Sequence, residues 1–355
     1  MSLDPRGLPG PDLDLAVDQV GARWGALEGM DLFFTGGTGF VGAWMTSVLL
    51  RAVDRGLLKA RVRLLTRSRN RVASALPWIA AHPAVTLVEG DVLGGTWDCQ
   101  GATHLVAGAT DARASLVQKD PRRMFETILD GTRRTLDRAR EAGVARALFL
   151  SSGAAHGPQP PEVARVREDQ FFGPDPLKPG AAYAEGKRAA EHLFALEGQM
   201  GLSFTVARLW AFVGPLLPLD EHFAVGNFLG DALAGRPVVV KGDGTTVRSY
   251  QYAADMAAWC WVLLAAGAPG QAYQVGSDEA VSIRALAGAC AALGGQEAQI
   301  LGVPDPSRRV DVYVPDTGLA AREFGLRNQV DLQDALGRTL AWHRKDRIQT
   351  GGGHG

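Results

Sequence analysis

The sequence predicts an α/β fold in which a doubly wound parallel sheet is followed by a smaller, mixed α+β lobe. Two observations predict it. Short apolar runs alternate with amphipathic helical stretches from Asp31 to about Leu150, and a glycine-rich turn follows the first apolar run directly. The 355 residues are 46% hydrophobic and 21% charged, which is enough apolar material for one large domain or two modest ones.

Each predicted element has its own local signal. Five short apolar runs have the composition of buried parallel strands. These runs are Leu32–Thr35, Val62–Thr66, Val85–Gly90, His104–Ala109 and Ala147–Ser152. Amphipathic stretches such as Met124–Gly143 lie between them and are expected to form the covering helices.

The chain changes in character after the fifth strand. A proline-rich connection from His156 to Gly180 is much longer than a usual αβ loop, and loops of that length tend to be functional. A helix from about Ala182 to Met200 and a strand from Phe204 to Trp210 then resume the sheet. The predicted units are an N-terminal helical extension (1–29), the main sheet domain (30–215), a mainly ligand-binding lobe with some segments returning to the sheet (216–346) and a flexible tail (347–355).

Composition limits the partners and the compartment. The formal net charge is −1, from 37 basic and 38 acidic residues, so we expect neither nucleic acid nor an anionic membrane as a partner. Cys99, Cys260 and Cys290 form no CxxC or Cys/His spacing, which favours a reducing compartment and argues against a metal site. The N-terminus lacks the apolar core of a signal peptide, and no apolar run is long enough to span a bilayer, so we expect a cytoplasmic protein.

The turn after the first strand has the spacing of a phosphate-binding loop. Gly36, Gly39 and Gly42 form a GxxGxxG pattern between a predicted strand and a predicted helix, which is the context that such a motif requires. Gly36 would permit the tight turn, Gly39 would let backbone amides approach a pyrophosphate, and Gly42 would let the helix pack closely on the strand. The sequence thus predicts a Rossmann-type dinucleotide site, with a merely strain-relieving turn as the alternative.

The end of the second strand distinguishes between nicotinamide cofactors. A carboxylate there would bind the ribose of NAD, but Thr66 occupies the position, and Arg67 and Arg69 follow. Guanidinium groups suit a 2′-phosphate, so NADP is favoured over NAD, with a solvated basic loop as the alternative. Asp91 is either an adenine contact or an acidic turn residue. The predicted cofactor contacts are Gly36, Thr38, Gly39, Phe40, Val41, Gly42, Thr66, Arg67, Arg69, Asp91, Val92, Ala107, Ala109 and Lys187.

A candidate catalytic set follows the fifth strand. Tyr183 and Lys187 are four residues apart in a predicted helix and therefore share one face. Free tyrosine titrates near ~10, too high for a general base at neutral pH, but a nearby ammonium group favours the phenolate. The strand itself ends at the edge of the sheet where ligands of such folds bind. Ser152 there would hydrogen-bond the reacting oxygen, whereas Ser151 more simply caps the strand.

These residues resemble the extended short-chain dehydrogenases/reductases, the NAD(P)-dependent nucleotide-sugar epimerase/dehydratase family, over about residues 30–345. The shared marks are TGGTGFVG, EGDV, the Ser152/Tyr183/Lys187 set, ARLWAFVGP, KGDGTTVRSYQYAAD, YQVGS and DLQDALGRTLAWHR. The resemblance implies a nucleoside-diphosphate sugar as substrate and a homodimer. It also implies a substrate site in which Arg248 pairs with the pyrophosphate. The other predicted substrate contacts are Thr110, Asp111, Asn227, Arg308 and Arg309.

The chain departs from the family where elimination chemistry is concerned. Sugar 4,6-dehydratases of this family carry an Asp-Glu pair directly after the catalytic hydroxyl, and the decarboxylases use a glutamate there. Here the two positions are Gly153 and Ala154, and neither side chain can move a proton. Asp111 is a possible substitute or a solvated loop acid. His156, where the family usually has tyrosine, is expected to be structural.

The leading functional interpretation is a sugar-nucleotide C4 epimerase that works through a keto intermediate. Tyr183 would exchange the hydroxyl proton, Ser152 would orient the oxygen, and Lys187 would tune the phenol and hold the nicotinamide ribose. The first alternative is an NADPH-dependent reductase of a keto-sugar, which Arg67 and Arg69 favour. Further alternatives are a dehydratase or decarboxylase with a substitute acid and base, a reductase of a non-nucleotide carbonyl compound, and a non-catalytic cofactor sensor.

Overall fold

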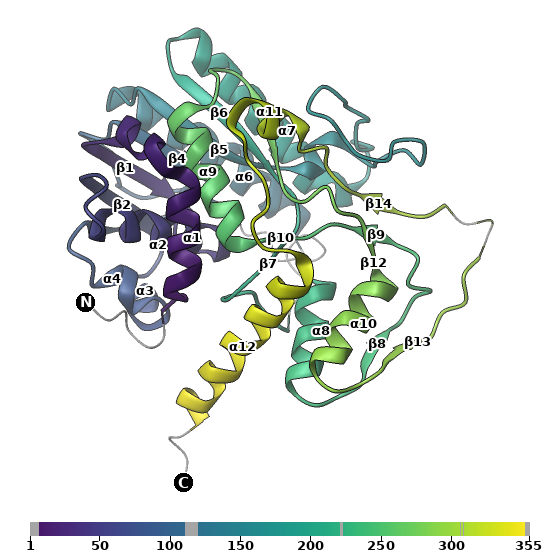
Figure 1. The fold of residues 1–355 in the computed structure, drawn as a ribbon. Coiled ribbons are helices and arrows are strands. Elements are labelled where there is room, and N and C mark those ends of the chain that lie inside the picture. Colours follow the sequence, from purple (N-terminus) through teal and green to yellow (C-terminus); the bar gives the residue numbers. More distant parts are fainter. Residues whose placement is uncertain (1–6, 111–119, 221–222, 306, 308, 352–355) are drawn as a thin grey trace.

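The computed structural model describes residues 7–110, 120–220, 223–305, 307 and 309–351 (Figure 1). Its centre is a seven-stranded sheet in the order β11-β6-β5-β4-β1-β2-β3, and every neighbouring pair is parallel. The strands are β1 (Met30–Thr35), β2 (Ala60–Thr66), β3 (Val85–Glu89), β4 (His104–Ala107), β5 (Arg146–Ser152), β6 (Ser203–Leu209) and β11 (Ala272–Val275). The predicted doubly wound sheet is confirmed, including its order reversal between β1 and β4.

Helices cover both faces of the sheet, and each face has its own apolar core. On one side lie α1 (Gly10–Val20), the 3-10 helix η1 (Gly21–Leu27), α2 (Phe40–Asp54) and α9 (Ala253–Ala266). On the other side α6 (Pro121–Glu141) packs beside α7 (Ala182–Gln199). The short helices are α3 (Arg69–Ala75), α4 (Pro77–Ala80), η2 (Gly153–His156) and η3 (Pro179–Ala181).

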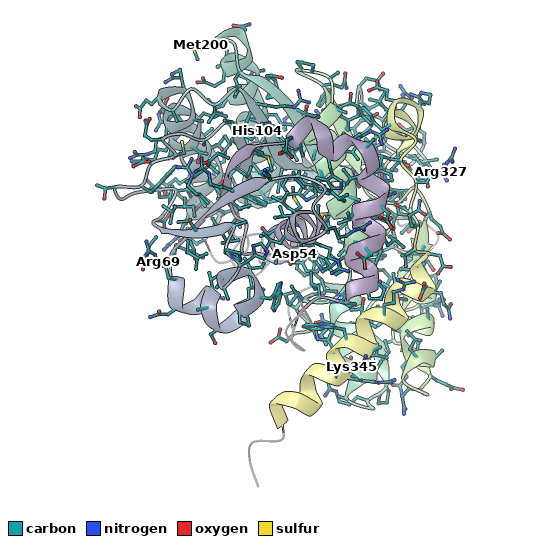
Figure 2. All side chains as sticks on the ribbon, turned by 60° about the vertical axis from the view of Figure 1, so that its left-hand side comes forward. Asp54, Arg69, His104, Met200, Arg327 and Lys345 are labelled. Atoms are coloured by element: carbon teal, nitrogen blue, oxygen red, sulfur yellow. The ribbon has the colours of Figure 1, made fainter. Side chains whose placement is uncertain are left out.

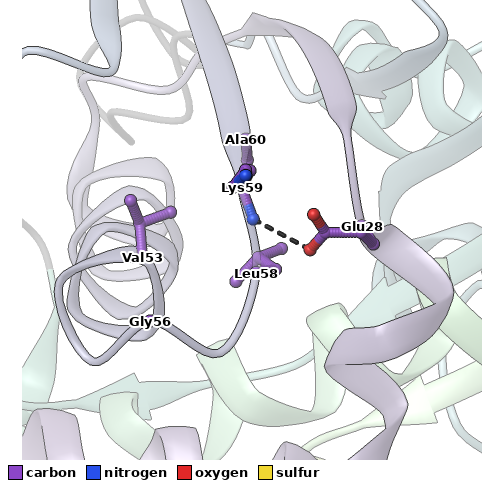
Figure 3. A pocket seen from close by; sticks show the side chains of 6 residues that line it. All are labelled: Glu28, Val53, Gly56, Leu58, Lys59 and Ala60. Carbon is purple, nitrogen blue, oxygen red and sulfur yellow. Dashed lines mark hydrogen bonds between the residues drawn. The ribbon is translucent and has the colours of Figure 1, made fainter.

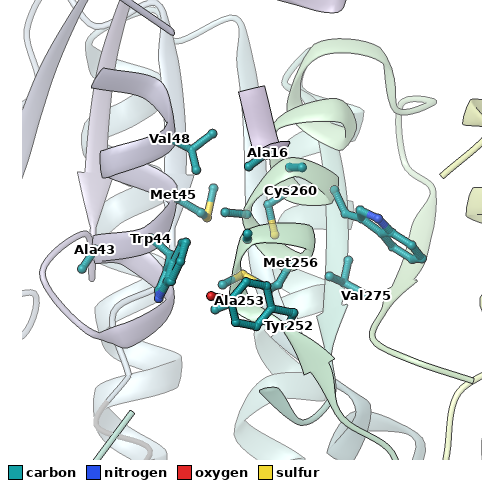
Figure 4. Packing of buried hydrophobic residues seen from close by; sticks show 14 of the residues in the cluster. Ala16, Ala43, Trp44, Met45, Val48, Tyr252, Ala253, Met256, Cys260 and Val275 are labelled. Carbon is teal, nitrogen blue, oxygen red and sulfur yellow. The ribbon is translucent and has the colours of Figure 1, made fainter. Parts of the chain in front are cut away.

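The N-terminal extension covers a helix that is apolar all round. Every residue of α9 from Ala253 to Leu264 is buried, because the sheet, α2 and α1 surround it. Figure 4 shows this packing, with Ala16 of α1 and Met45 of α2 facing Cys260 of α9. The predicted helical stretch of the extension therefore supplies a wall of the core.

A buried ion pair fastens that extension to the C-terminal helix. The Tyr252 hydroxyl donates to Asp12 at 2.6 Å, and Arg338 of α12 (Leu332–Gly351) contacts the other oxygen of the Asp12 carboxylate at 2.5 Å. The Asp12 residue is 3% exposed. A charge buried to this degree is stable only when it is paired, so the three segments hold one another in place.

The C-terminal lobe combines short strands with helices and lies at the lower right of Figure 1. Its helices are α8 (Ala224–Leu233) and α10 (Ile283–Leu293), and α12 packs against both. The short helix α11 (Gly318–Phe324) packs against β11 of the main sheet and lies near the top of Figure 1. The strands of the lobe pair as β10 (Gln251–Tyr252) with β7 (Phe212–Val213), as β13 (Ala298–Ile300) with β8 (Val238–Val240), and as the set β12 (Val281–Ser282), β9 (Val247–Arg248) and β14 (Val312–Tyr313). The last set brings residues 247–248 and 312–313, far apart in the sequence, side by side.

Three further findings concern membranes, metals and thiols. In the part of the chain that the structure describes, no helix is long and apolar enough to cross a membrane. Within the same part, no group of three His, Cys, Asp or Glu residues is placed to hold a metal ion. Cys99, Cys260 and Cys290 are buried and unpaired, and burial raises the pKa of each thiol, to about 11 for Cys99.

Candidate active site

The candidate site lies at the carboxyl edge of the sheet, where the strand order reverses between the paired strands β1 and β4. In sheets of this type, that reversal opens the crevice in which ligands bind. The turn after β1 and the loop after β4 touch there, since a Cβ placed on Gly36 would lie 2.6 Å from the Gly108 carbonyl carbon. Gly36 also has a φ of +85°, a conformation that favours glycine.

The three glycines of the turn serve different purposes. A Cβ on Gly42 would lie 2.2 Å from the Gly36 carbonyl oxygen, so this position must be glycine for α2 to pack on the turn. A Cβ on Gly39 would meet no atom nearer than 3.7 Å. Gly39 is the N-cap of α2 and has no side-chain cap, so the first amides of that helix stay available. An uncrowded glycine at an uncapped helix start fits the pyrophosphate of a dinucleotide.

The residues at the predicted adenosine end are mostly exposed or used in local turns. The Thr66 hydroxyl accepts from the Ser68 amide at 3.3 Å, and Asp91 accepts from the Leu93 amide at 2.9 Å. Arg69 lies at the outer edge of the molecule, with its Nε 3.7 Å from Glu89 (Figure 2). Arg67 and Arg69 are exposed, Thr38, Phe40, Val41, Ala109 and Thr110 are partly exposed, and Val92 and Ala107 are buried.

The predicted catalytic residues lie together. Ser152 ends β5, and its Oγ accepts from the Ala154 amide at 3.1 Å. Tyr183 lies in the first turn of α7, where the nearby Ser152 hydroxyl acts to lower the pKa of its phenol. One helical turn on, the Lys187 Nζ lies 5.9 Å from the Tyr183 ring centroid and donates to the Leu150 carbonyl at 2.7 Å. A hydroxyl, a phenol and an ammonium group thus converge at the end of β5.

Burial acts on the two titratable groups in opposite directions. It raises the pKa of Tyr183, and the nearby Ser152 hydroxyl opposes that rise. Desolvation lowers the pKa of Lys187 to about 7, against the opposing influence of Glu191. Both shifts reflect the cost of a charge in a buried site, and a phenolate beside an ammonium group would offset that cost for both.

The two adjacent serines at the end of β5 have separate partners. The Ser151 Oγ donates to the Glu191 carboxylate at 2.5 Å, and Glu191 forms an ion pair with Arg208 at 2.8 Å. Successive side chains of a strand point to opposite faces, which places Ser152 with Tyr183 and Ser151 with the Glu191–Arg208 pair. Ser151 therefore contributes to a buried polar network behind the site.

His156 belongs to the same network. It is fully buried, its Nε2 lies 2.8 Å from the Gln274 amide nitrogen, and its Nδ1 lies 2.5 Å from the Gln170 carbonyl. Desolvation, together with nearby Arg208, lowers the pKa of the His156 imidazole. A neutral histidine with these partners anchors the long loop after β5, as expected of a structural residue.

Two aromatic side chains fill the space beside Gly153. A Cβ on Gly153 would lie 2.6 Å from ring atoms of Trp210 and 2.6 Å from the Tyr313 hydroxyl oxygen. The Trp210 and Tyr313 rings stand 4.2 Å apart, centroid to centroid. Sequence reasoning missed both aromatic residues, because no spacing pattern links them to the end of β5.

The predicted substrate residues lie in different parts of the structure. Arg248 of β9 is paired with Tyr313 in the strand register, and its NH2 contacts Asp311 at 2.6 Å. Asn227 is exposed on α8, and Arg309 is an exposed residue that donates to the Gln159 carbonyl. Asp111 and Arg308 lie outside the described residues. Of this set, the structure brings Arg248 close to the hydroxyl cluster through Tyr313.

Two surface hollows lie at the opposite, amino-terminal edge of the sheet. One is lined by Glu28, Val53, Gly56, Leu58, Lys59 and Ala60, and Figure 3 shows the Glu28 carboxylate accepting from the Lys59 amide there, at 3.0 Å. The other is bordered by residues such as Asp31 and Arg63. Neither contains any residue of the catalytic cluster, so shape alone does not locate the candidate site.

Known proteins resemble the chain in sequence over most of its length. Residues 32–276 match the model of the NAD dependent epimerase/dehydratase family. The UDP-glucuronic acid decarboxylase 1 of Xenopus tropicalis is 28% identical over 321 residues, which are 89% of this chain and 72% of that protein. A dTDP-glucose 4,6-dehydratase of Streptomyces antibioticus is 27% identical over 324 residues, 90% of this chain and 93% of that protein.

Solved structures of related enzymes also resemble the chain over most of its length. The dTDP-glucose 4,6-dehydratase DesIV of Streptomyces venezuelae, with NAD and TYD bound, superposes with a TM-score of 0.77 at 26% identity and covers 90% of this chain and 98% of its own. The UDP-glucose 4-epimerase of Thermus thermophilus in complex with NAD gives a TM-score of 0.71 at 25% identity, covering 89% and 99%. The protein is therefore an extended short-chain dehydrogenase/reductase, an NAD(P)-dependent enzyme that belongs to the NAD dependent epimerase/dehydratase family.

Proposed function

We propose that the protein is a sugar-nucleotide epimerase that oxidises one carbon of the sugar, most simply C4, and returns the hydride to the resulting ketone from the other face. One observation favours epimerisation over the elimination and decarboxylation reactions of the family. Gly153 and Ala154 provide no acid or base, and Trp210 and Tyr313 occupy the space beside Gly153.

Elimination and decarboxylation need more proton-transferring groups than epimerisation does. A carboxylate side chain at position 153 would have to displace the Trp210 ring or the Tyr313 hydroxyl, which lie 2.6 Å from the place of its Cβ. The Ser152 hydroxyl accepts from the Ala154 amide, and the phenols of Tyr183 and Tyr313 lie near it. These groups suit a reaction in which one hydroxyl of the sugar is deprotonated and reprotonated.

The residues of this chain would have the following roles in the proposed reaction. The nicotinamide cofactor, when bound, accepts the hydride and gives it back. Amides of the Gly36–Gly42 turn hold its pyrophosphate. Tyr183 takes the proton from the sugar hydroxyl and later returns it, Ser152 orients the sugar oxygen, and Lys187 stabilises the Tyr183 phenolate.

Arg248 is the proposed partner of the substrate diphosphate. A guanidinium group binds phosphate oxygens through paired, charge-assisted hydrogen bonds. Its present partner Asp311 is exposed, with 68% of its side chain accessible, so a diphosphate could replace it at little cost. Asn227, Thr110 and either Arg308 or Arg309 are the further proposed contacts.

An NADPH-dependent reductase of a keto-sugar is the second candidate. Thr66 replaces the carboxylate that would bind the ribose of NAD, and the side chains of Arg67 and Arg69 are exposed beside it. We therefore propose NADP as the preferred cofactor and NAD as the alternative, although the two solved relatives described above contain NAD. An epimerase retains its cofactor through the reaction, whereas a reductase must exchange it.

One experiment separates these candidates. The purified protein is denatured to release and identify any retained cofactor, and then incubated with UDP- and dTDP-linked sugars, including 4-keto forms, with and without NADPH. Products are analysed by mass and proton spectra. An isomer of equal mass with retained dinucleotide supports the epimerase, and NADPH consumption with a product two hydrogens heavier supports the reductase. Loss of water or of carbon dioxide from the sugar would contradict both.

We also infer a homodimer formed through α6 and α7. These helices pack on each other on one face of the sheet, and Leu196 of α7 and the following Met200 are 44% and 60% exposed. Light scattering after gel filtration measures the mass directly. A monomer, or a dimer that Leu196→Glu and Met200→Glu leave intact, would contradict this interface.

A further inference from the structure

A chain of buried hydrogen bonds joins the long loop after β5 to the indole that packs beside Gly153. The Trp210 Nε1 donates to the Gln274 Oε1 at 2.7 Å, and the Gln274 Nε2 lies 2.8 Å from the His156 Nε2. His156 and Gln274 are fully buried, and Trp210 is 8% exposed. Since water does not reach these side chains, a bond lost from the chain would leave a polar group without a partner.

The chemistry of the partners fixes the direction of each bond. An indole N–H can only donate, so the Gln274 Oε1 accepts, and the NH2 group of Gln274 faces the His156 ring and the Val166 carbonyl, 3.3 Å away. The Arg208 NH1, which can only donate, lies 3.4 Å from the same His156 nitrogen. The His156 Nε2 therefore accepts, and the proton is on Nδ1, which donates to the Gln170 carbonyl at 2.5 Å.

The Trp210 end of this chain lies against the strand end that carries Ser152. A Cβ on Gly153, the next residue, would lie 2.6 Å from Trp210 ring atoms, and a Cβ on Gly276 would lie 3.0 Å from the Trp210 Cβ. The Tyr313 ring is 4.2 Å away, centroid to centroid. The indole thus fills a narrow slot, and a change in its tilt would move atoms beside Ser152.

We propose that His156 is a positioning residue, which holds the Gln274 amide and thereby fixes the tilt of the Trp210 indole, the wall of the site beside Ser152. Without an acceptor at the His156 Nε2, the buried NH2 group of Gln274 would be unpaired. The amide would have to turn toward another partner, and its bond to Trp210 would weaken. The inference deepens the proposed function and rests on it for one point only, that the sugar reacts beside Ser152.

Two substitutions of His156 separate this role from simple anchoring of the loop. A glutamine side chain is long enough to place an acceptor where the Nε2 lies, facing Gln274, whereas an asparagine reaches only the position of the Nδ1, facing the Gln170 carbonyl. His156→Gln should therefore keep the bond from Gln274 to Trp210, and His156→Asn should weaken it. If His156 acted only through Gln170, His156→Asn would be the milder variant.

Solvent exchange of the indole N–H groups measures the Trp210 bond without any substrate. The chain has eight tryptophans, and the Trp210 signal in the NMR spectrum of isotope-labelled protein is the one that Trp210→Phe removes. We expect this N–H to exchange with deuterium about tenfold faster in His156→Asn and at nearly the wild-type rate in His156→Gln. The buried indoles of Trp24 and Trp44, which donate to carbonyls elsewhere in the core, should exchange as before. His192→Asn, at an exposed histidine, is the matched control.

Two outcomes of the exchange measurement would overturn the inference. Equal acceleration of Trp210, Trp24 and Trp44 would mean that His156→Asn only lowers the global stability. Equal Trp210 rates in His156→Asn and His156→Gln would mean that the acceptor toward Gln274 is unimportant. Gln274→Met, which removes the middle of the chain, supplies the same test should His156→Asn not fold, and an unchanged Trp210 rate there would also overturn the inference.

Kinetics show whether the tilt of Trp210 matters for the reaction once a substrate is known. In His156→Asn we expect kcat to fall about tenfold and KM to change less than about twofold, with recovery in His156→Gln, because the indole lies beside Ser152. Trp210→Phe should show a similar loss, to which His156→Asn adds nothing. An unchanged kcat despite faster Trp210 exchange would contradict the positioning role. Because exchange needs no turnover, a protein inactive on sugar nucleotides would still show it, so failure of the proposed function and failure of this inference are distinguishable.

Discussion

Tyr183 and Tyr252 occupy similar local positions but have opposite environments. Tyr183 lies in the first turn of α7, and Tyr252 is the N-cap of α9. The Tyr183 phenol has a serine hydroxyl and a lysine ammonium group beside it. The Tyr252 phenol donates to the buried Asp12 carboxylate at 2.6 Å.

The partners decide what each phenol can do. Burial and the Asp12 charge raise the pKa of Tyr252 far above its usual value, because a phenolate beside a carboxylate would be repelled. The Tyr252 proton is therefore fixed and serves to hold the N-terminal extension. At Tyr183 burial also raises the pKa, but the neighbours favour the charged form. The same residue type is thus structural in one place and poised for proton transfer in the other.

The largest difference between the Tyr183 and Tyr252 variants is expected in the turnover rate. Tyr183→Phe should reduce turnover by about 10²- to 10⁴-fold, because the proton acceptor is lost, while cofactor affinity changes less than about twofold. Tyr252→Phe should keep most of the turnover. Product formation from the active sugar nucleotide and fluorescence titration with NADPH or NADH measure the two properties. Equal loss of turnover and cofactor affinity in Tyr183→Phe would make Tyr183 a structural residue as well.

Lys187 should show its burial as a pH dependence of stability. Its pKa is lowered from 10.5 to about 7 in the folded protein, so between these values the unfolded chain binds the extra proton. Its contribution to stability therefore rises with pH through that window, by up to about 1.4 kcal/mol per pH unit. Urea unfolding of wild type and Lys187→Met between pH 7 and pH 10 gives the difference.

The control for Lys187 is a lysine that is exposed on the surface of the protein. Lys241→Met removes an exposed ammonium group and is measured in parallel as the reference variant. Parallel stability curves for wild type and Lys187→Met would show that Lys187 is not desolvated.

The structural role of Tyr252 should appear as lost stability. Tyr252→Phe removes one donor from the Asp12 carboxylate, which is buried, and should lower the free energy of unfolding by about 1–3 kcal/mol. Tyr273→Phe is the matched control, because its phenol donates to Glu323, an exposed residue that water can solvate instead. Equal losses in the two variants, measured by urea unfolding, would mean that burial of the carboxylate is unimportant.

Asp255 should give the smallest effect. Burial raises its pKa to about 6, so between about pH 4 and pH 6 the folded protein binds a proton that the unfolded chain releases. Its contribution to stability therefore falls as the pH rises through this window. Comparison of wild type with Asp255→Asn at pH 5 and pH 6.5 should show a change of about 1–2 kcal/mol in their difference. A constant difference would show that the bonds from the Gln329 and Val330 amides keep Asp255 ionised throughout.

Local sequence predicted the elements of the sheet closely. Runs such as Val62–Thr66 and Ala147–Ser152 match β2 and β5 to within two residues, because strands in the middle of a parallel sheet are mainly apolar. The predicted helix from Ala182 to Met200 is α7, Ala182–Gln199. The short strands of the C-terminal lobe carry no such signal, since two- and three-residue strands owe their pairing to distant partners.

By itself the sequence determined the glycine turn, the Tyr183–Lys187 spacing and the family, because each depends on residues that are close together in the chain. Only the tertiary structure decided that Ser151 bonds Glu191, and that Trp210 and Tyr313 close the space beside Gly153. The reason is physical. Hydrogen-bond direction and steric room depend on which segments meet at the sheet edge, and Tyr313 arrives there through the pairing of β14 with β9, far from Ser152 in sequence.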